Sequence, residues 1–66
     1  MEVKDIIYGL RVKKGLSQDA LARKVMVTRQ AVSRWETGET TPHVETLKQL
    51  SQLFDVSINT LLGAPR

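Results

Sequence analysis

The stretch from Ser17 to Gly38, SQDALARKVMVTRQAVSRWETG, most constrains the fold, because it contains two helical patterns too short to be stable alone. Ser17 and Thr28 are residue types that cap helix N-termini, and glycine is the type that most often follows a helix C-terminus. The spacing predicts helices at about 17–25 and 28–37, which shared packing has to hold at a fixed angle.

The break between these two helices, Val25-Met26-Val27, contains no glycine, although glycine is the usual residue where a chain closes a helix in a left-handed conformation. The sequence predicts that Met26 adopts this conformation at a cost of about 1 kcal/mol, or distorts the turn slightly. We expect its side chain to recover part of that cost by packing on apolar neighbours.

Apolar residues at helical spacing predict three further helices, and no segment alternates apolar and polar residues as a strand would. The first helix carries Val3, Ile6, Ile7 and Leu10 and ends near Gly15, the fourth carries Val44, Leu47, Leu50, Leu53 and Phe54, and a short fifth helix capped by Ser57 carries Ile58, Leu61 and Leu62. With 66 residues, the chain is predicted to form one all-α domain of five helices over 1–66.

Composition narrows the setting and the partners of this domain. The chain has no cysteine, no apolar run long enough to cross a bilayer and no stretch of signal-peptide type, so we expect a cytoplasmic protein. Its net charge is +3 and its pI is about 9.7, and seven of its ten basic residues lie between Arg11 and Arg34. This concentration of positive charge in the first half favours a polyanionic partner such as nucleic acid.

The polar residues of the helix at 28–37 have a chemistry that suits DNA bases. Val32 and Trp35 are spaced to face the core together. The other faces present donors or dual donor–acceptors and no acid, namely Arg29, Gln30, Ser33 and Arg34. Arginine can donate two hydrogen bonds to guanine and glutamine can pair bidentately with adenine. The sequence therefore predicts a base-reading helix.

Enzyme chemistry has no basis in this sequence. There is no carboxylate pair framed by a pocket, no metal-ligand spacing, no phosphate-cradling glycine loop and no nucleophile–base set. We expect no catalytic activity, no cofactor and no metal.

The residues Gln18, Ala22, Met26, Val32 and Trp35 resemble the helix-turn-helix of the Cro and phage-repressor-type family, also called the xenobiotic response element family. The resemblance covers nearly the whole chain, through LRVKKGLSQDALA, VTRQAVSRWETG and TLKQLSQLFDVSINTLLG. It implies a lambda-repressor-like bundle that binds double-stranded DNA sequence-specifically as a transcriptional regulator, with a repressor as the expected type. Relatives bind pseudo-palindromic operators as homodimers.

The resemblance also implies roles for individual residues. It assigns base contacts to Arg29, Gln30, Ser33 and Arg34. It assigns phosphate contacts to Ser17, Gln18, Thr28, Thr40, Thr41 and His43, with Gln18 also bracing Gln30. It assigns a partly buried ion pair to Arg11 and Glu36. For self-association we expect the fifth helix, around Ile58, Leu61 and Leu62, with at least one of those leucines closing the core instead.

Three positions depart from the family pattern: Met26 in the turn, His43 where a helix-capping residue is usual, and Glu39 in the loop that faces DNA. Glu39 is expected to weaken non-specific attraction slightly or to point away.

Two alternatives stay open on the sequence alone. The chain is either a complete small repressor or the N-terminal domain of a longer regulator. The same fold also serves as an antitoxin that binds a partner protein as well as its operator.

Overall fold

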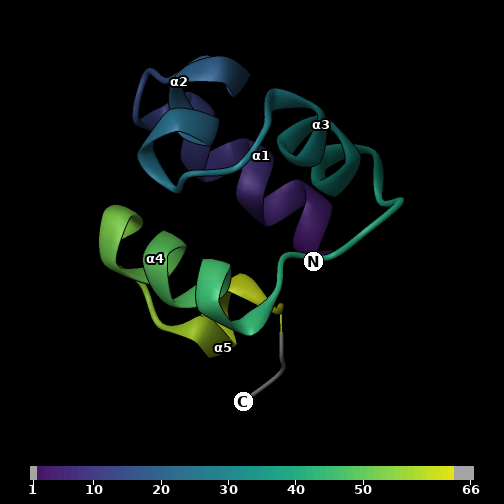
Figure 1. The fold of residues 1–66 in the computed structure, drawn as a ribbon. Coiled ribbons are helices and arrows are strands. Elements are labelled where there is room, and N and C mark those ends of the chain that lie inside the picture. The colour runs from purple at the N-terminus through teal and green to yellow at the C-terminus, as the bar shows by residue number, and fades with distance from the viewer. Residues whose placement is uncertain (1, 64–66) are drawn as a thin grey trace.

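The computed structural model describes residues 2–63, and within that range the chain forms five helices and no strand (Figure 1). The helices are α1 (Val3–Lys13), α2 (Gln18–Lys24), α3 (Arg29–Thr37), α4 (Val44–Phe54) and α5 (Ile58–Leu61). The predicted all-α architecture of five helices is confirmed. The observed ends of α2 and α3 each lie within one residue of the predicted ends.

Side-chain caps begin three of the helices. Ser17 Oγ accepts a hydrogen bond of 3.0 Å from the backbone N–H of Ala20 at the start of α2. Thr28 Oγ1 accepts one of 3.1 Å from Ala31 at the start of α3, and Ser57 Oγ starts α5 in the same way. These oxygens satisfy donors that a helix N-terminus otherwise leaves unpaired. The three predicted caps are confirmed.

The helix α4 begins and ends differently. His43 is its N-terminal capping residue, but the His43 side chain makes no capping hydrogen bond, because imidazole lacks the short oxygen-bearing side chain of a good cap. At its other end the chain turns through Asp55 in the left-handed conformation, with φ +57°. Aspartate tolerates this conformation better than most side chains.

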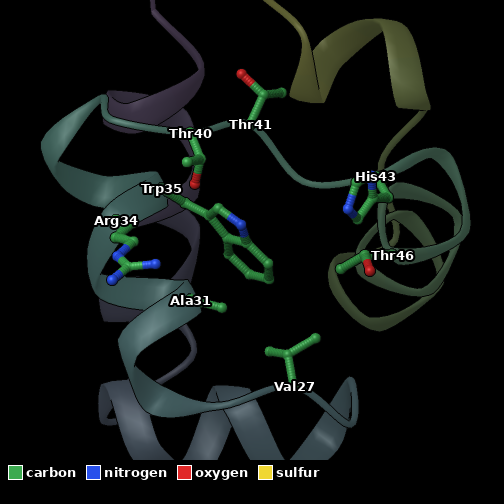
Figure 2. Close-up of a pocket in the computed structure, with 8 residues that line it drawn as sticks. All are labelled: Val27, Ala31, Arg34, Trp35, Thr40, Thr41, His43 and Thr46. Atoms are coloured by element: carbon green, nitrogen blue, oxygen red, sulfur yellow. The ribbon is translucent and has the colours of Figure 1, made fainter.

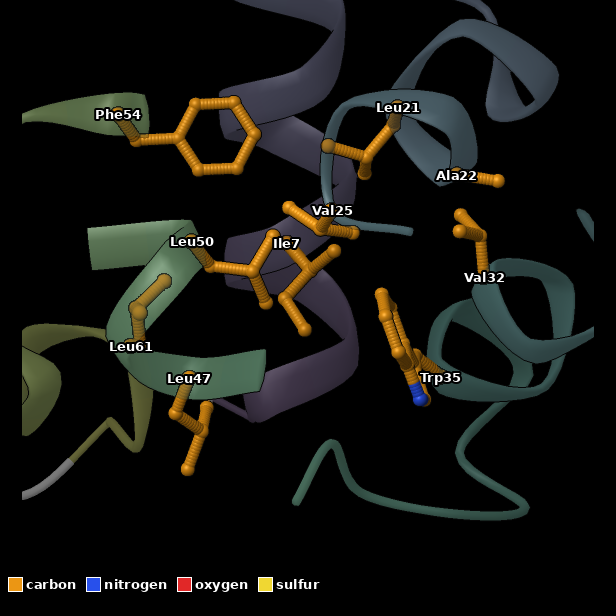
Figure 3. Close-up of a cluster of buried hydrophobic side chains, with 10 residues drawn as sticks. All are labelled: Ile7, Leu21, Ala22, Val25, Val32, Trp35, Leu47, Leu50, Phe54 and Leu61. Atoms are coloured by element: carbon orange, nitrogen blue, oxygen red, sulfur yellow. The ribbon is translucent and has the colours of Figure 1, made fainter. Parts of the chain in front are cut away.

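The first helix lies between two pairs of helices. α2 packs on α3, α4 packs on α5, and α1 packs on both α3 and α5, so that α1 joins the two pairs (Figure 1). Figure 3 shows Ile7 of α1 between Leu50 of α4 and Val25, which follows α2. Ile7 and Leu50 are fully buried and Val25 is nearly so, which makes this contact the centre of the core.

Only part of each apolar stripe is buried. The core comprises Ile7, Leu21, Ala22, Val25, Val32, Trp35, Leu47, Leu50, Phe54 and Leu61. Val44 is part of α4 as predicted, but it lies in the first turn and its side chain is 63% exposed. Val3, Ile6 and Leu10 are half-buried and pack at the edge of the core.

The break between α2 and α3 is left-handed at Met26, as the sequence predicted, with φ +61°. The expected packing of its side chain is wrong, because Met26 is 85% exposed. The exposure of Met26 follows from its two neighbours. Val25 is buried in the core and Val27 packs against it, so these two side chains occupy the inward-facing side of the turn. The backbone strain at Met26 is therefore not offset by burial.

Candidate nucleic-acid interface

The first turn of α3 presents two long polar side chains to solvent. Arg29 and Gln30 are exposed, no acidic residue lies in that turn, and Val32 and Trp35 on the opposite face are buried. Within residues 2–63 neither Arg29 nor Gln30 takes part in an ion pair or a side-chain hydrogen bond. Both side chains can therefore meet a ligand without first breaking an internal contact.

The remaining two predicted base-contact residues lie one turn further along α3. Ser33 is half-buried, and Arg34 is exposed. The Arg34 Nε atom lies 3.9 Å from Glu39 Oε1, and both side chains are more than 60% exposed, at 61% and 66%. Such an exposed pair contributes little stability, so it leaves Arg34 available. Glu39, at the family's departure position, faces Arg34 rather than pointing away.

The capping roles of Ser17 and Thr28 are compatible with their expected phosphate contacts. Each hydroxyl oxygen uses a lone pair to accept the capping hydrogen bond, and its hydrogen stays available to donate. Both residues are exposed and precede the positive end of a helix dipole, which favours an approaching anion.

A partly buried ion pair connects α1 to α3. Arg11 donates from Nε to Glu36 Oε2 at 2.7 Å and from Nη2 to Glu36 Oε1 at 3.1 Å, and the two side chains are only 12% and 6% exposed. Arg11 Nη1 also donates to the backbone oxygen of Leu16 at 2.8 Å, and the Tyr8 ring centre lies 5.3 Å from its guanidinium carbon. The hydrogen bond to Glu36 raises the pKa of Arg11, although burial opposes this, so Arg11 stays charged.

Gln18 joins the same ion pair, because its Nε2 donates to Glu36 Oε1 at 3.0 Å. The expected brace between Gln18 and Gln30 is wrong, since no side-chain hydrogen bond within residues 2–63 joins them. The carboxylate of Glu36 is a stronger hydrogen-bond acceptor than the neutral amide of Gln30, which explains why Gln18 donates to Glu36. Glu36 thus connects α1, α2 and α3 at one point and holds the angle between α2 and α3.

A groove of about 280 Å³ lies between α3, the loop that follows it, and the start of α4 (Figure 2). It is lined by Val27, Ala31, Arg34, Trp35, Thr40, Thr41, His43 and Thr46. The structure therefore brings together one predicted base-contact residue and three predicted phosphate-contact residues, from α3, the loop and α4.

Two features of this groove were not predicted from the sequence. Thr46 was not assigned a role, although its position one turn after His43 on a helix could have indicated that they share a face. Trp35 was assigned to the core alone, whereas one edge of its ring also lines the groove (Figure 2). No sequence signal distinguishes a core tryptophan with one edge at the surface from a fully enclosed one.

Of the two leucines expected near the self-association surface, Leu61 is the one that closes the core, which agrees with the expectation that at least one of them would do so. Leu61 is fully buried and closes the core against Leu50, so it cannot form part of an interface in the folded domain. Ile58 is half-buried against the core, and Leu62, just after the helix, is 41% exposed. Because α5 has only four residues, a single turn decides which apolar side chain faces inward.

The part of the chain that the structure describes contains neither a membrane-spanning helix nor a metal-binding cluster. None of its helices is both long and apolar enough to cross a lipid bilayer. No group of three or more His, Asp or Glu side chains there is placed to hold a metal ion.

Comparison with known families gives one match that covers most of the chain. The helix-turn-helix family model HTH_3 matches residues 7–61, which include all of α2, α3, α4 and α5 and most of α1.

Two curated proteins are similar in sequence. The HTH-type transcriptional activator BcrR of Enterococcus faecalis is 42% identical over 63 residues, which cover 96% of this chain and 31% of BcrR. The SPbeta prophage-derived HTH-type transcriptional regulator YonR of Bacillus subtilis is 38% identical over 52 residues, covering 79% of this chain and 48% of YonR. This chain therefore spans about a third to a half of the length of these relatives.

A solved structure is similar over its full length. The P22 c2 repressor protein, in complex with synthetic operator 9T, superimposes with a TM-score of 0.91 at 34% identity, and the match covers 98% of each chain. The bundle is thus the fold of the phage repressors, as the sequence predicted.

Proposed function

This chain belongs to the helix-turn-helix family, and on that premise we propose that it is the sequence-specific DNA-binding domain of a transcriptional regulator. The observation that carries the proposal is the outer face of α3, where Arg29 and Gln30 are exposed, unpaired within the described residues and free of acidic neighbours in their turn. A similar fold, that of the P22 c2 repressor protein, has been solved in complex with an operator.

In this proposal α3 enters the major groove of DNA and α2 crosses the sugar–phosphate backbone. Arg29, Gln30 and Arg34 read base edges, and Ser33 lies on the same face. Support comes from the matched chemistry of arginine with guanine and of glutamine with adenine. The network of Arg11, Glu36 and Gln18 holds α2 and α3 at the angle that lets both contact one duplex.

We further propose that the phosphate backbone on either side of α3 is held at two places. Ser17, Gln18 and Thr28 are placed at the starts of α2 and α3, where positive helix ends favour an anion. Thr40, Thr41 and His43 line the groove beside α3. These contacts position the domain and carry no sequence information themselves.

A homodimer on a pseudo-palindromic operator is the assembly that we propose, with half-sites about one helical turn apart. Leu62 and the outer part of Ile58 are its candidate contacts, because they are the apolar side chains near α5 that remain reachable. With this DNA-binding role we also propose a cytoplasmic location.

Repression is the proposed mode of regulation. This mode is supported by the P22 c2 repressor protein, which shares the fold with a TM-score of 0.91 at 34% identity. Activation is the alternative, since the activator BcrR is 42% identical over 63 residues. The antitoxin alternative is not favoured, because the curated relatives described above are named as transcriptional regulators.

Selection of bound duplexes from a random pool tests the proposal directly. We expect one enriched half-site, repeated with two-fold symmetry, and retention of binding at moderate salt. Non-specific phosphate binding alone weakens steeply with salt, so a pool that stays unenriched at moderate salt contradicts sequence-specific recognition. A Gln30→Ala variant, run through the same selection, should enrich a half-site with one relaxed position.

A further inference from the structure

Trp35 is the only tryptophan of the chain, and its indole N–H has no hydrogen-bond partner within residues 2–63. The side chain as a whole is 5% exposed, so more than nine-tenths of it is buried. Within the described residues, every side-chain nitrogen or oxygen that is fully enclosed has a hydrogen-bond partner. The Nε1 atom of Trp35 has no partner, so it is not fully enclosed and keeps some access to solvent. Because an indole N–H can only donate, an acceptor atom that approaches from this open side can take its hydrogen bond.

The free N–H faces the groove beside α3. Figure 3 shows the indole nitrogen on the side of the ring away from Val25 and Ile7, and Figure 2 shows it directed into the space between α3 and α4. The face of the ring packs in the core, so only this edge can meet a ligand. A base cannot stack on Trp35, but an acceptor atom in the groove can receive its hydrogen bond.

The surroundings of that N–H are polar and carry no acidic side chain. Besides Trp35 and two apolar residues, the groove is lined by Arg34, Thr40, Thr41, His43 and Thr46. In addition, the backbone N–H groups in the first turn of α4, from Val44 to Thr46, have no acceptor within residues 2–63, because His43 makes no side-chain cap. α4 has 11 residues, so its dipole adds positive potential at this end.

We propose that Trp35 is a DNA-contact residue, whose indole N–H donates a hydrogen bond to one backbone phosphate oxygen seated in the groove between α3 and α4. This inference rests on the proposed function and adds to it a specific donor on the recognition helix itself. The bond fixes the depth of α3 in the major groove, because Trp35 is held rigidly by the core. A core residue therefore links the packing of the domain to its position on DNA.

Methylphosphonate substitution tests the contact, because it replaces one phosphate oxygen by a methyl group at a chosen position of the selected duplex. We expect one position in each half-site at which the substitution lowers the affinity of the unmodified protein about tenfold, as for loss of a hydrogen bond to a charged acceptor. For Trp35→Phe the same substitution should change affinity by less than about twofold, since the donor is already absent.

Ile7→Val is the matched control, because it removes core volume without touching the groove. It should keep the full methylphosphonate effect. If methylphosphonate substitution lowers the affinity of Trp35→Phe as much as that of the unmodified protein at every position, the inference is contradicted. If the unmodified protein binds no duplex at all, the proposed function is contradicted instead.

The unmodified protein offers an independent measurement, so the test does not depend on the folding of Trp35→Phe. Its one indole N–H gives one resonance in a proton–nitrogen correlation spectrum. Duplex binding should shift this proton downfield and slow its exchange with water. An unshifted resonance in the bound state overturns the inference, as does an equal shift with inorganic phosphate alone, which assigns the groove to free phosphate.

Discussion

Arg11 and Glu36 are 25 positions apart in the chain, and their side chains meet in a bidentate ion pair with an Nε–Oε2 distance of 2.7 Å. Glu36 also accepts from Gln18, so one carboxylate connects the first three helices. These helices are short, and the proposed DNA recognition depends on the angle at which α2 and α3 cross. The pair therefore sets an angle as well as contributing to stability.

Removal of one partner of this pair should be strongly destabilising. Arg11→Met leaves the Glu36 carboxylate buried without its main partner, so the free energy of unfolding should fall by at least about 2 kcal/mol. Urea denaturation measures the loss as a lower midpoint at an unchanged slope. Arg23→Met is the control, because the Arg23–Asp19 pair is 80% and 55% exposed and should contribute at most about 1 kcal/mol. If Arg11→Met and Arg23→Met lowered the free energy of unfolding equally, the burial of the Arg11–Glu36 pair would make no difference to its contribution.

Met26→Gly should stabilise the domain. Glycine adopts φ +61° without the clash that a side chain meets there, and the exposed Met26 side chain loses no packing. We expect a gain of about 0.5–1 kcal/mol, or a few degrees in melting temperature for a domain of this size, with DNA binding unchanged. Asp55→Gly, at the other left-handed position, should gain less, because aspartate tolerates this conformation. A lower melting temperature for Met26→Gly is the opposite outcome, and it would show that Met26 makes contacts in solution.

Base reading predicts a selective loss of affinity. Gln30→Ala should lose roughly 1–3 kcal/mol on the selected half-site and relax the preference at one base pair. Gel-shift titrations against the selected duplex and each single-base variant measure both effects. Lys48→Ala, on the exposed face of α4 and 58% exposed, is the control and should keep the full preference. If Gln30→Ala binds all duplexes more weakly by the same factor, Gln30 contacts the backbone rather than a base.

Two helix caps of the same kind separate an effect on stability from an effect on DNA contact. Thr28→Ala and Ser57→Ala each remove a hydroxyl that accepts from the third residue beyond it, so each should lower the free energy of unfolding by about 1 kcal/mol. Thr28 precedes the recognition helix, whereas Ser57 precedes α5. Only Thr28→Ala should also weaken binding to every duplex alike, measured under conditions where both variants remain folded. A matching loss of affinity in Ser57→Ala would attribute the effect to stability.

The two adjacent leucines at the end of α5 should behave differently. Leu61→Ala removes a fully buried side chain and should destabilise by about 2–5 kcal/mol, whereas Leu62→Arg changes a side chain that is 41% exposed and should leave unfolding nearly unchanged. Leu62→Arg should instead shift the protein towards the monomer in sedimentation experiments at increasing concentration. An unchanged association state places the dimer contact elsewhere on the surface.

Local features of the fold were predictable from the sequence. Ser17, Thr28 and Ser57 cap helices, and Gly38 ends α3, because these signals act between residues three or four positions apart. The left-handed turn at Met26 was also predictable, from the resemblance to a family that usually carries a glycine at this position of the turn. The set of exposed polar residues on α3 followed from the buried pair Val32 and Trp35 by helical geometry alone.

Only the tertiary structure decided which of several similar side chains faces which neighbour. Leu61 closes the core and Leu62 does not, Gln18 bonds to Glu36 rather than to Gln30, and the Trp35 ring leaves its N–H at a groove. These outcomes depend on how far each short helix is rotated and at what angle it crosses its neighbours. The rotation and the crossing angle of each helix are set by the packing of all five helices together. The sequence of any single helix therefore cannot predict them.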